Sequence, residues 1–219
     1  MNNPNQAKVM ATIDGRPLIE HVLGSLAPLA PRRTVLVVGH HRESVMEFVR
    51  SLQFANAEFA IQAEQLGTGH AVAQCEDLLK DFQGAVLILA GDVPLLTTET
   101  LRNFIEKHRE SRSDISVLST FAPVPTGYGR IVRSSDGAFL RIVEEKDADA
   151  QEKLINEVNT GIMAIPGNKL KKWLNQLNNS NAQGEYYLTD IIEMAVADGV
   201  AIVTSQPETV DEVLGVNNR

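Results

Sequence analysis

The sequence has very little cysteine and no long hydrophobic run. Cys75 is its one cysteine, so the chain forms no internal disulfide, and its apolar helical surroundings favour a buried thiol over a reactive one. No apolar stretch approaches the ~20 residues of a membrane-spanning helix. The first residues, MNNPNQ, are polar and do not resemble a signal peptide. We therefore expect a cytoplasmic protein with no membrane partner.

Positive charge is also scarce. The 20 Lys and Arg residues face 28 Asp and Glu residues, which gives a net charge of −8 at pH 7. A general binder of nucleic acid polymers needs a basic surface, so we expect no such partner. A small phosphorylated ligand needs only a local cationic site, and this charge is compatible with one.

The first half of the chain alternates short apolar strands with amphipathic helices. A length of 219 residues with 43% hydrophobic residues suits one α/β domain. The alternation of strands and helices is typical of a doubly wound sheet with helices on both faces. We predict helices over residues 17–29, 43–52, 68–79 and 98–109, and strands over residues 34–38, 58–61 and 85–90.

The second half adds antiparallel strands. We predict strands over residues 115–121, 129–133, 138–143, 159–165 and 201–204, and helices over residues 170–177 and 189–197. Ser134–Gly137 reads as a hairpin turn between two of these strands. The sheet is therefore expected to be mixed.

The stretch Ala85–Leu96 is the strongest strand signal, and one carboxylate follows it. The six apolar residues from Ala85 to Ala90 predict a strand that is buried on both faces. Gly91 leaves room for a ligand to approach the backbone, and Pro94 ends the strand. Asp92 thus lies where α/β sheets bind substrates or metals, but it could equally cap the following helix.

A glycine-rich turn at Gln62–Ala71 precedes a helix. Backbone N–H groups at such a helix start can bind an anion or an acceptor on a ring edge, although the same turn often serves only as a helix entry. The amide of Gln62 suits a nucleobase edge because it offers both a donor and an acceptor. His70 is more typical of a packed or capping histidine than of a catalytic base.

Four further polar segments have structural interpretations, and two of them also have functional ones. Tyr128 lies between two glycines, in a tight turn or beside a ligand. The charge cluster at residues 144–146 follows a predicted strand, where such clusters are usually solvated. The polar residues 159–161 lie at the start of another predicted strand. The segment Asn181–Asp190 is either a ligand loop or a loop anchored by Tyr186 and Tyr187.

Together and in this order, these motifs resemble the uridyltransferase (pyrophosphorylase) domain of the bacterial bifunctional N-acetylglucosamine-1-phosphate uridyltransferase/glucosamine-1-phosphate acetyltransferases. The resemblance runs from about Lys8 to the last residue. The matching stretches are 62–71, 90–95, 125–131, 142–147, 159–162, 181–192 and 215–219. It implies a Rossmann-like nucleotidyltransferase fold, with a mixed, mostly parallel sheet and a small antiparallel sugar-binding part.

The resemblance also implies a reaction. The family joins UTP and N-acetylglucosamine-1-phosphate into UDP-N-acetylglucosamine and pyrophosphate, for peptidoglycan and lipopolysaccharide precursors, and uses Mg²⁺. Asp92 and Asn217 match its metal ligands, and Lys8 matches a basic residue at the phosphates. The remaining matches are nucleotide-binding and sugar-binding positions, in that order: Gln62, Gly67, Thr68, Ala90 and Gly91, then Gly129, Glu144 and Asn159.

The sequence departs from this family at both ends. The family's first strand and phosphate loop, Leu-Ala-Ala-Gly-x-Gly-Thr-Arg, have no counterpart before Lys8, so we expect two neighbouring strands with unpaired edges. No hexapeptide repeat is present, so we expect neither the acetyltransferase β-helix nor a trimer built by it.

The missing loop leaves three hypotheses open. The first is a uridyltransferase, and the second is a nucleotide-sugar-binding remnant without catalysis. The third is a nucleotidyltransferase for another sugar phosphate or base.

Overall fold

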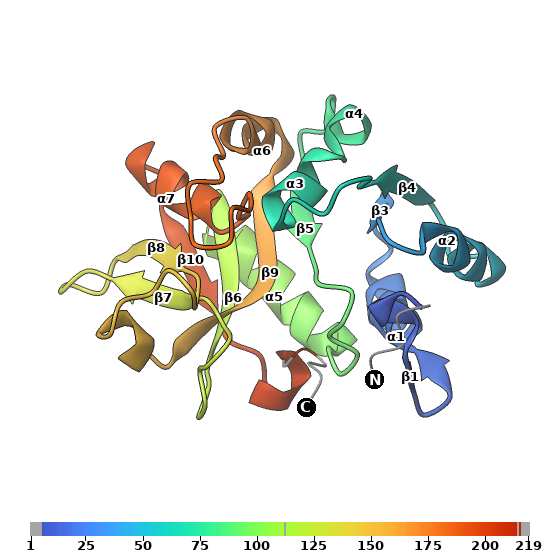
Figure 1. Cartoon of the computed structure of the whole chain (residues 1–219), viewed down its shortest axis with the longest axis horizontal. Helices are drawn as coiled ribbons and strands as arrows, with labels where there is room; N and C mark the ends of the chain where they lie inside the picture. Colours follow the sequence, from blue (N-terminus) through green and yellow to red (C-terminus); the bar gives the residue numbers. More distant parts are fainter. Residues whose placement is uncertain (1–5, 112, 214, 216–219) are drawn as a thin grey trace.

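The computed structural model describes residues 6–111, 113–213 and 215 (Figure 1). The strands are β1 Thr12–Ile13, β2 Arg16–Pro17, β3 Thr34–Val38, β4 Ala57–Ile61, β5 Ala85–Ile88, β6 Ile115–Phe121, β7 Arg130–Arg133, β8 Phe139–Val143, β9 Glu157–Pro166 and β10 Ile202–Ser205. The α-helices are α1 Leu18–Leu26, α2 Arg42–Ser51, α3 Thr68–Ala73, α4 Glu76–Leu79, α5 Thr98–Ser111, α6 Gly167–Leu174 and α7 Asp190–Ala197. Short 3₁₀ turns are η1 Lys8–Met10, η2 Ala27–Leu29, η3 Glu152–Leu154 and η4 Val210–Val213.

Six strands form the main sheet, which is mixed as expected. Strands β5, β6, β7 and β10 run in one direction and β8 and β9 in the other, since β9 is antiparallel to β5, β6 and β7. The expectation of a mostly parallel sheet therefore holds for strand direction but not for pairing. Among the described residues of this sheet, only β10 and β6 are parallel neighbours, because β9 is antiparallel to β5, β6 and β7, and β8 is antiparallel to β7.

Strand β9 changes partners half-way along one edge. Val158 pairs with Arg130 of β7, whereas Met163 to Pro166 pair with β5. Between them, Gly161 has φ of +80°, and the register with β6 shifts between Leu118 and Ser119. Positive φ suits glycine at such an irregularity. The sheet therefore forks near Gly161, with β7 on one side of the fork and β5 on the other.

Helices cover both faces of the main sheet, as predicted. Along β9, Met163 and Ile165 pack with α6 and α7, while the alternate residues Ile162 and Ala164 pack with α5. Because successive strand residues point to opposite faces, the two groups of helices lie on opposite sides. Trp173 of α6 is among the largest fully buried side chains.

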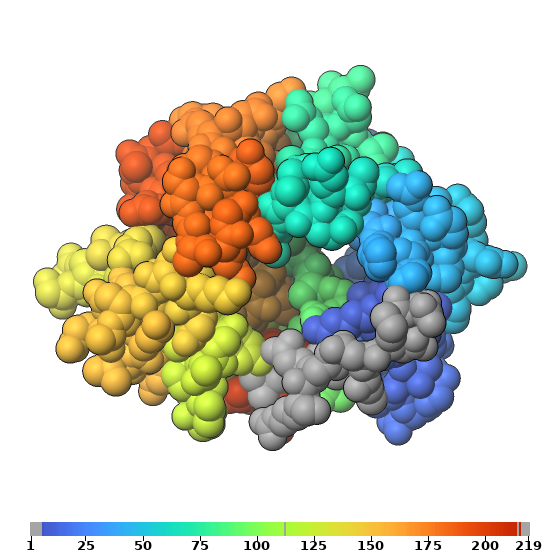
Figure 2. All heavy atoms as spheres, in the orientation of Figure 1, coloured from blue at the N-terminus to red at the C-terminus, as the bar shows by residue number. Residues whose placement is uncertain are grey.

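The parallel pair β3 and β4 forms a separate two-stranded sheet. In the described part of the chain, β3 pairs only with β4 and β5 only with β9, so each has one edge without a strand partner. This agrees with the expectation of unpaired edges. Figure 1 shows this smaller part beside the main sheet, and Figure 2 shows an opening between them.

Helix α1 joins the two parts. Its Ile19 and Leu23 pack with β3 and α2, and its Val22 packs with Leu101 and Phe104 of α5. The hydroxyl of Thr98 also donates to the Ser25 carbonyl at 2.8 Å. Helix α1 therefore packs against both parts of the divided sheet.

Two sequence predictions need correction here. The stretch 85–90 is not buried on both faces: β5 ends at Ile88, and its residues are half-buried or exposed, because one of its edges has no strand partner among the described residues. The helix expected over residues 68–79 is two helices, α3 and α4, separated by Gln74 and Cys75. Cys75 is buried, and burial raises the pKa of its thiol to about 11, as expected for an unreactive cysteine.

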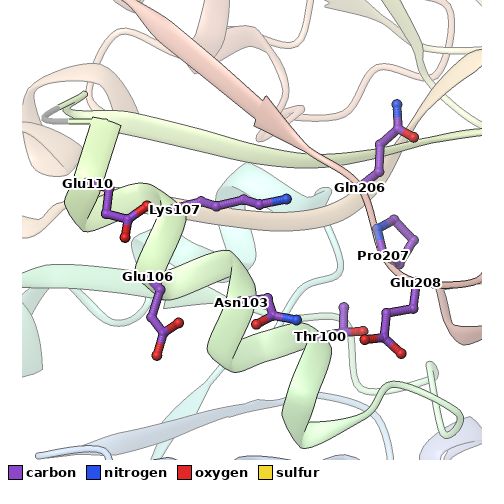
Figure 3. A pocket seen from close by; sticks show the side chains of 8 residues that line it. All are labelled: Thr100, Asn103, Glu106, Lys107, Glu110, Gln206, Pro207 and Glu208. Atoms are coloured by element: carbon purple, nitrogen blue, oxygen red, sulfur yellow. The ribbon is translucent and has the colours of Figure 1, made fainter.

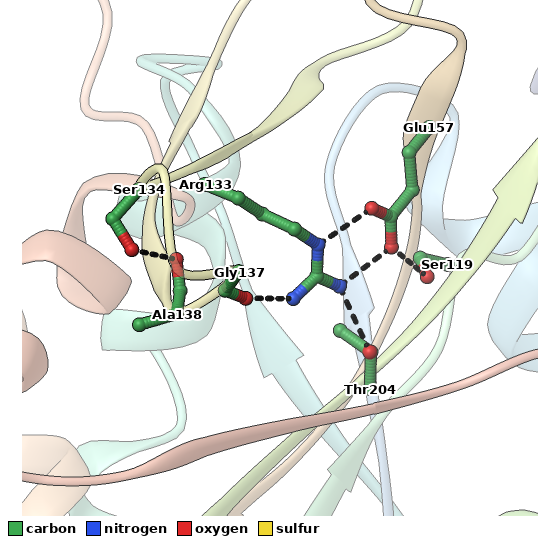
Figure 4. Close-up of polar contacts among 7 residues, drawn as sticks. All are labelled: Ser119, Arg133, Ser134, Gly137, Ala138, Glu157 and Thr204. Atoms are coloured by element: carbon green, nitrogen blue, oxygen red, sulfur yellow. Dashed lines mark hydrogen bonds and ion pairs between the residues drawn. The ribbon is translucent and has the colours of Figure 1, made fainter.

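A partly buried ion pair joins β7 and β9 on the β7 side of the fork (Figure 4). The guanidinium of Arg133 on β7 donates to both carboxylate oxygens of Glu157 on β9, at 2.8 Å each. It also donates to Thr204 of β10, and Glu157 accepts a bond from Ser119 of β6. Burial raises the pKa of Glu157, but these hydrogen bonds and the charge of Arg133 outweigh it and leave that pKa below its ordinary value.

We predict that Glu157→Leu lowers the free energy of unfolding by about 2 kcal/mol, between the values for exposed and buried pairs, because it leaves the partly exposed Arg133 without its counter-charge. The double variant Arg133→Met/Glu157→Leu should recover most of that loss, since no uncompensated charge remains. Urea unfolding at pH 7 measures both. A double variant no more stable than Glu157→Leu would contradict the account.

Candidate functional site

Asp92 lies just beyond the end of β5, on the β5 side of the fork. Its Oδ2 atom is 2.6 Å from Nζ of Lys8 in η1. The ion pair is partly exposed, with 45% of the Lys8 side chain and 27% of the Asp92 side chain accessible. Two predicted site residues from distant parts of the chain are thus in direct contact.

The alternative interpretation of Asp92 as a helix cap is wrong. The N–H of Thr100, in the first turn of α5, donates instead to Oγ1 of Thr97 at 3.1 Å. Thr97 therefore caps this helix. The Asp92 carboxylate contacts Lys8 instead, and its role as a ligand group stays a prediction.

Gly91 makes a close approach, but to the protein itself. A methyl group at Gly91 would lie 3.2 Å from Cγ1 of Val9 and 3.8 Å from Cδ1 of Ile19. The close contacts of this glycine are with side chains of the protein, and its place beside the nucleotide stays a prediction. Gly91 lets η1 and α1 pack against the segment after β5, and this packing brings Lys8 to Asp92.

The C-terminal segment returns to Asp92. A methyl group at Gly215 would lie 3.7 Å from Asp92 Oδ2. The segment is anchored by Glu212 of η4, whose buried carboxylate accepts hydrogen bonds from Thr97 (2.9 Å) and Thr100. Asn217, the predicted second metal ligand, lies outside the described residues.

The glycine-rich turn joins the end of β4 to α3. The Gln62 side chain donates to the Gly67 carbonyl at 3.1 Å and lies 3.2 Å from Nδ1 of His70. His70 therefore packs within the turn, as expected of a non-catalytic histidine. The turn is folded around the two side chains that the sequence singled out.

The loop 181–189 packs tightly against this turn. A methyl group at Gly67, where φ is +111°, would lie 2.6 Å from the carbonyl oxygen of Tyr186. Gly69 N–H donates to that same oxygen at 2.8 Å, and Leu188 N–H donates to Oγ1 of Thr68 at 3.0 Å. The glycines are thus needed for contact with the protein's own backbone.

The predicted sugar-binding residues meet on the β7 side of the fork. Asn159 N–H donates to the Gly129 carbonyl at 2.9 Å. A methyl group at Gly129 would lie 3.5 Å from either carboxylate oxygen of Glu144. Glu144 accepts a bond from Thr189 at 2.8 Å, so the loop 181–189 reaches this group too.

Asp147 anchors the same loop, and sequence reasoning missed it as a separate residue. Its carboxylate accepts from Ala182 N–H at 2.9 Å and from the Tyr187 hydroxyl at 3.1 Å. Burial, followed by the negative charge of Asp147, raises the pKa of Tyr187 to about 12. The loop therefore bridges the glycine-rich turn and the predicted sugar-binding residues.

A comparison with known protein families identifies this arrangement. The family model described as "Nucleotidyl transferase" matches residues 4–208. The chain belongs to the nucleotidyl transferase family.

Curated relatives of this nucleotidyl transferase bear out the resemblance read from the motifs. The chain is 51% identical to the "Bifunctional protein GlmU" of Cupriavidus taiwanensis over 97% of its own length and 45% of that protein. It is 45% identical to the "Bifunctional protein GlmU" of Exiguobacterium sibiricum, again over 97% of its length and 46% of that protein. The chain thus spans about half the length of these relatives.

Solved structures share the fold. A Bacillus anthracis protein described as a glucose-1-phosphate thymidylyltransferase aligns with a TM-score of 0.75 at 20% identity, over 93% of this chain and 79% of that one. A UDP-glucose pyrophosphorylase bound to UDP-glucose aligns with a TM-score of 0.74 at 14% identity, over 94% and 85%. The nucleotidyltransferase fold expected from the sequence is confirmed.

A cavity of about 420 Å³ lies away from these residues, between α5 and the segment after β10 (Figure 3). Asn103 and Lys107 line one side, and Gln206 and Glu208 line the other. No predicted site residue reaches it.

Among the described residues, no helix is long and apolar enough to cross a bilayer.

An acidic cluster surrounds the loop 181–189 of this nucleotidyl transferase. Burial raises the pKa of Glu144. The hydrogen bond from Thr189 works against this rise, and the negative charges of neighbouring carboxylates add to it. Asp190, at the start of α7, has its pKa raised to about 6, first by burial and then by the charges of Glu144, Glu193 and Asp147. The cluster therefore holds negative charge at some cost to stability.

We predict that Asp190→Asn stabilises the protein at pH 7.5 but not at pH 4. The folded-state pKa of about 6 exceeds the ordinary 3.8, so the folded state binds the proton more tightly, and stability falls as the pH rises through this interval. After discounting for solvent screening, the gain is on the order of 1 kcal/mol. Thermal melts at the two pH values measure it.

Asp198, the C-cap residue of α7, provides the matched control. Hydrogen bonds from Lys172 and Trp173 lower the pKa of Asp198, so Asp198→Asn should reduce stability at pH 7.5. Equal melting shifts for the two variants would contradict the burial argument.

Proposed function

We propose that this chain transfers uridylyl from UTP to N-acetylglucosamine-1-phosphate, giving UDP-N-acetylglucosamine, a precursor of peptidoglycan and lipopolysaccharide, and pyrophosphate. The observation that carries the proposal is the meeting, around one fork in the sheet, of the motif residues of the family. Family membership and the GlmU relatives support it.

In this proposal, the glycine-rich turn after β4 and the β7 side of the fork hold different parts of the substrates. Gln62 takes the base edge, and backbone N–H groups of Gly67 and Thr68 take base or phosphate acceptors. Gly129, Glu144 and Asn159 take the sugar hydroxyls and the N-acetyl group. Ala90 and Gly91, in the segment after β5, line the nucleotide pocket.

In the reaction, an oxygen of the sugar phosphate forms a bond to the α-phosphorus of UTP, and the bond from that phosphorus to the bridging oxygen of pyrophosphate breaks. The chain's main task is to hold the two phosphates in line and to offset their charge. Lys8 is placed to do so because its ammonium already lies at Asp92. In the complex it would exchange part of that contact for phosphate oxygens.

Mg²⁺ is the metal that we propose for Asp92 and Asn217. The donor set fits: a carboxylate and an amide supply oxygen, and Mg²⁺ keeps several waters and binds substrate phosphates. The 2.6 Å contact with the Lys8 ammonium indicates that a cation is favoured at Asp92. When bound, the metal would supply charge neutralisation at the phosphates.

We predict that Asp92→Asn lowers kcat/KM for pyrophosphate release by about 100-fold or more, because it removes charge stabilisation in the transition state. Its melting temperature should stay within a few degrees of the wild type, since the Lys8 pair is partly exposed. Asp114→Asn, which breaks another exposed pair with Lys169, is the control and should keep full activity.

Wild-type protein that is folded but releases no pyrophosphate from UTP and N-acetylglucosamine-1-phosphate would refute the proposal. Binding of UDP-N-acetylglucosamine by calorimetry without turnover would favour the binding remnant instead. A panel of nucleotides and sugar phosphates tests whether another substrate pair is preferred.

We further propose that a strand bearing the family's phosphate loop fits between β3 and β5. Its backbone would pair with two edges that lack strand partners in the described part of the chain. The half-buried Val35 and Val37 of β3 and Val86 to Ile88 of β5 would then be covered.

We predict that an N-terminal extension ending in Leu-Ala-Ala-Gly-x-Gly-Thr-Arg raises the melting temperature by at least about 5 °C and increases turnover. The same extension with prolines in its strand is the control, because proline cannot donate to a ladder. Equal melting temperatures for the two extended proteins would refute this placement.

A further inference from the structure

The segment 125–129, which precedes β7, folds as a tight turn. Tyr128 N–H donates to the Pro125 carbonyl at 3.2 Å, and Gly127 has φ of +89°. The N–H of Gly127 donates to Oε2 of Glu145 at 3.1 Å. The turn is therefore attached to the segment that follows β8, where the predicted sugar-binding residue Glu144 also lies.

Arg130, the first residue of β7, is a buried cation in contact with this turn. Its side chain is only 1% exposed. Nη2 lies 2.6 Å from Oε2 of Glu145, and Nη1 donates to the carbonyl oxygen of Tyr128. Burial raises the pKa of Glu145, but hydrogen bonds from Arg130 and Gly127 and the nearby positive charges outweigh it and leave that pKa below its ordinary value. The guanidinium is therefore shared between an ionised carboxylate and a backbone carbonyl.

This ion pair is not arranged for stability alone. Nε of Arg130 is buried and has no hydrogen-bond partner in the part of the chain that the structure describes. A buried guanidinium with an unpaired N–H carries a desolvation cost that an apolar side chain of similar volume would avoid. An ion pair retained at this cost calls for a role other than stability.

The geometry of one peptide group indicates that role. The described residues contain no cis peptide bond, so the C=O of Tyr128 and the N–H of Gly129, which share a peptide group, point in opposite directions. Because the carbonyl faces Arg130, the N–H of Gly129 points away from it. This N–H has no hydrogen-bond acceptor among the described residues, and Gly129 lies beside Glu144 and Asn159.

We propose that Arg130 and Glu145 are a positioning pair that holds the peptide between Tyr128 and Gly129 with its N–H directed at an acceptor oxygen of the bound sugar phosphate. The inference rests on the proposed function, because it takes Gly129 as a sugar-binding residue. Neither side chain of the pair touches the substrate. A donor that is fixed in advance need not be ordered when the sugar binds, so the pair lowers KM for the sugar phosphate.

The experiment measures KM for N-acetylglucosamine-1-phosphate and KM for UTP in Arg130→Lys. The ammonium keeps the charge beside Glu145, but one nitrogen cannot occupy both places that Nη1 and Nη2 hold, so the Tyr128 carbonyl loses its donor. We expect KM for the sugar phosphate to rise about tenfold, the effect of one lost hydrogen bond, and KM for UTP to change less than about twofold. Calorimetry should show the same split, with UDP-N-acetylglucosamine binding weakened and UTP binding retained.

Two double variants complete the design. Arg130→Met/Glu145→Gln removes the pair without leaving an uncompensated charge, and it should show the same split between the two KM values. Arg133→Met/Glu157→Leu is the matched control, because Arg133 lies on the same strand and its ion pair does not involve the segment 125–129. Both KM values of this control should equal those of the wild type.

An unchanged KM for the sugar phosphate in folded Arg130→Lys would overturn the inference, and so would an equal rise in both KM values, which indicates a general loss of structure. If Arg130→Lys does not fold, the double variant at positions 130 and 145 decides by the same two values. If neither protein folds, the pair is structural and the inference is also overturned. A wild type that releases no pyrophosphate refutes the proposed function instead, so the two failures are distinguishable.

Discussion

The fork in β9 is the constraint on which the rest of the structure depends. One edge of this strand pairs with β7 before Gly161 and with β5 after it. Backbone groups at the change of partner must be satisfied locally, and side chains do this: Gly161 N–H donates to Asn159, and the Thr160 hydroxyl donates to the Leu118 carbonyl. The opening between the two partners is where polar residues gather. A continuous ladder would leave no such place.

The loop 181–189 joins the glycine-rich turn after β4 to the predicted sugar-binding residues on the β7 side of the fork. Its backbone pairs with Leu66 and Gly69 on the glycine-rich turn, and its Thr189 donates to Glu144 near β8. Because these contacts are short and largely backbone-mediated, the turn cannot shift without the loop. The groups proposed to hold the base and the sugar are therefore mechanically coupled, although more than 70 residues separate Gln62 from Glu144 in the sequence.

Sequence reasoning found what local patterns encode. The bounds of β3 were predicted to the residue, because a branched apolar run ending at Gly39 has few other solutions. Asp92 was singled out by its place after a strand. The fork was not predictable, since it depends on which edges of β9 meet β5 and β7. Nor was the role of Thr97, which caps α5 in place of Asp92, or of Glu212, whose partners lie more than 100 residues away. Gly67 and Gly91 were recognised from the sequence, but their close contacts with Tyr186 and Val9 depend on the tertiary structure and could not be predicted from it.

The Lys8–Asp92 ion pair connects the two parts of the divided sheet. Lys8 belongs to the part built on α1 and β3, whereas Asp92 follows β5 in the main sheet. Their ion pair spans the two parts but is partly exposed, so it contributes little to their association, on the order of 1 kcal/mol or less. Exchanging this pair for contacts with a polyphosphate therefore costs little. The hydrophobic packing of α1 and the contacts of the loop 181–189 with the turn after β4 also join the two parts, so their association does not depend on the Lys8–Asp92 pair.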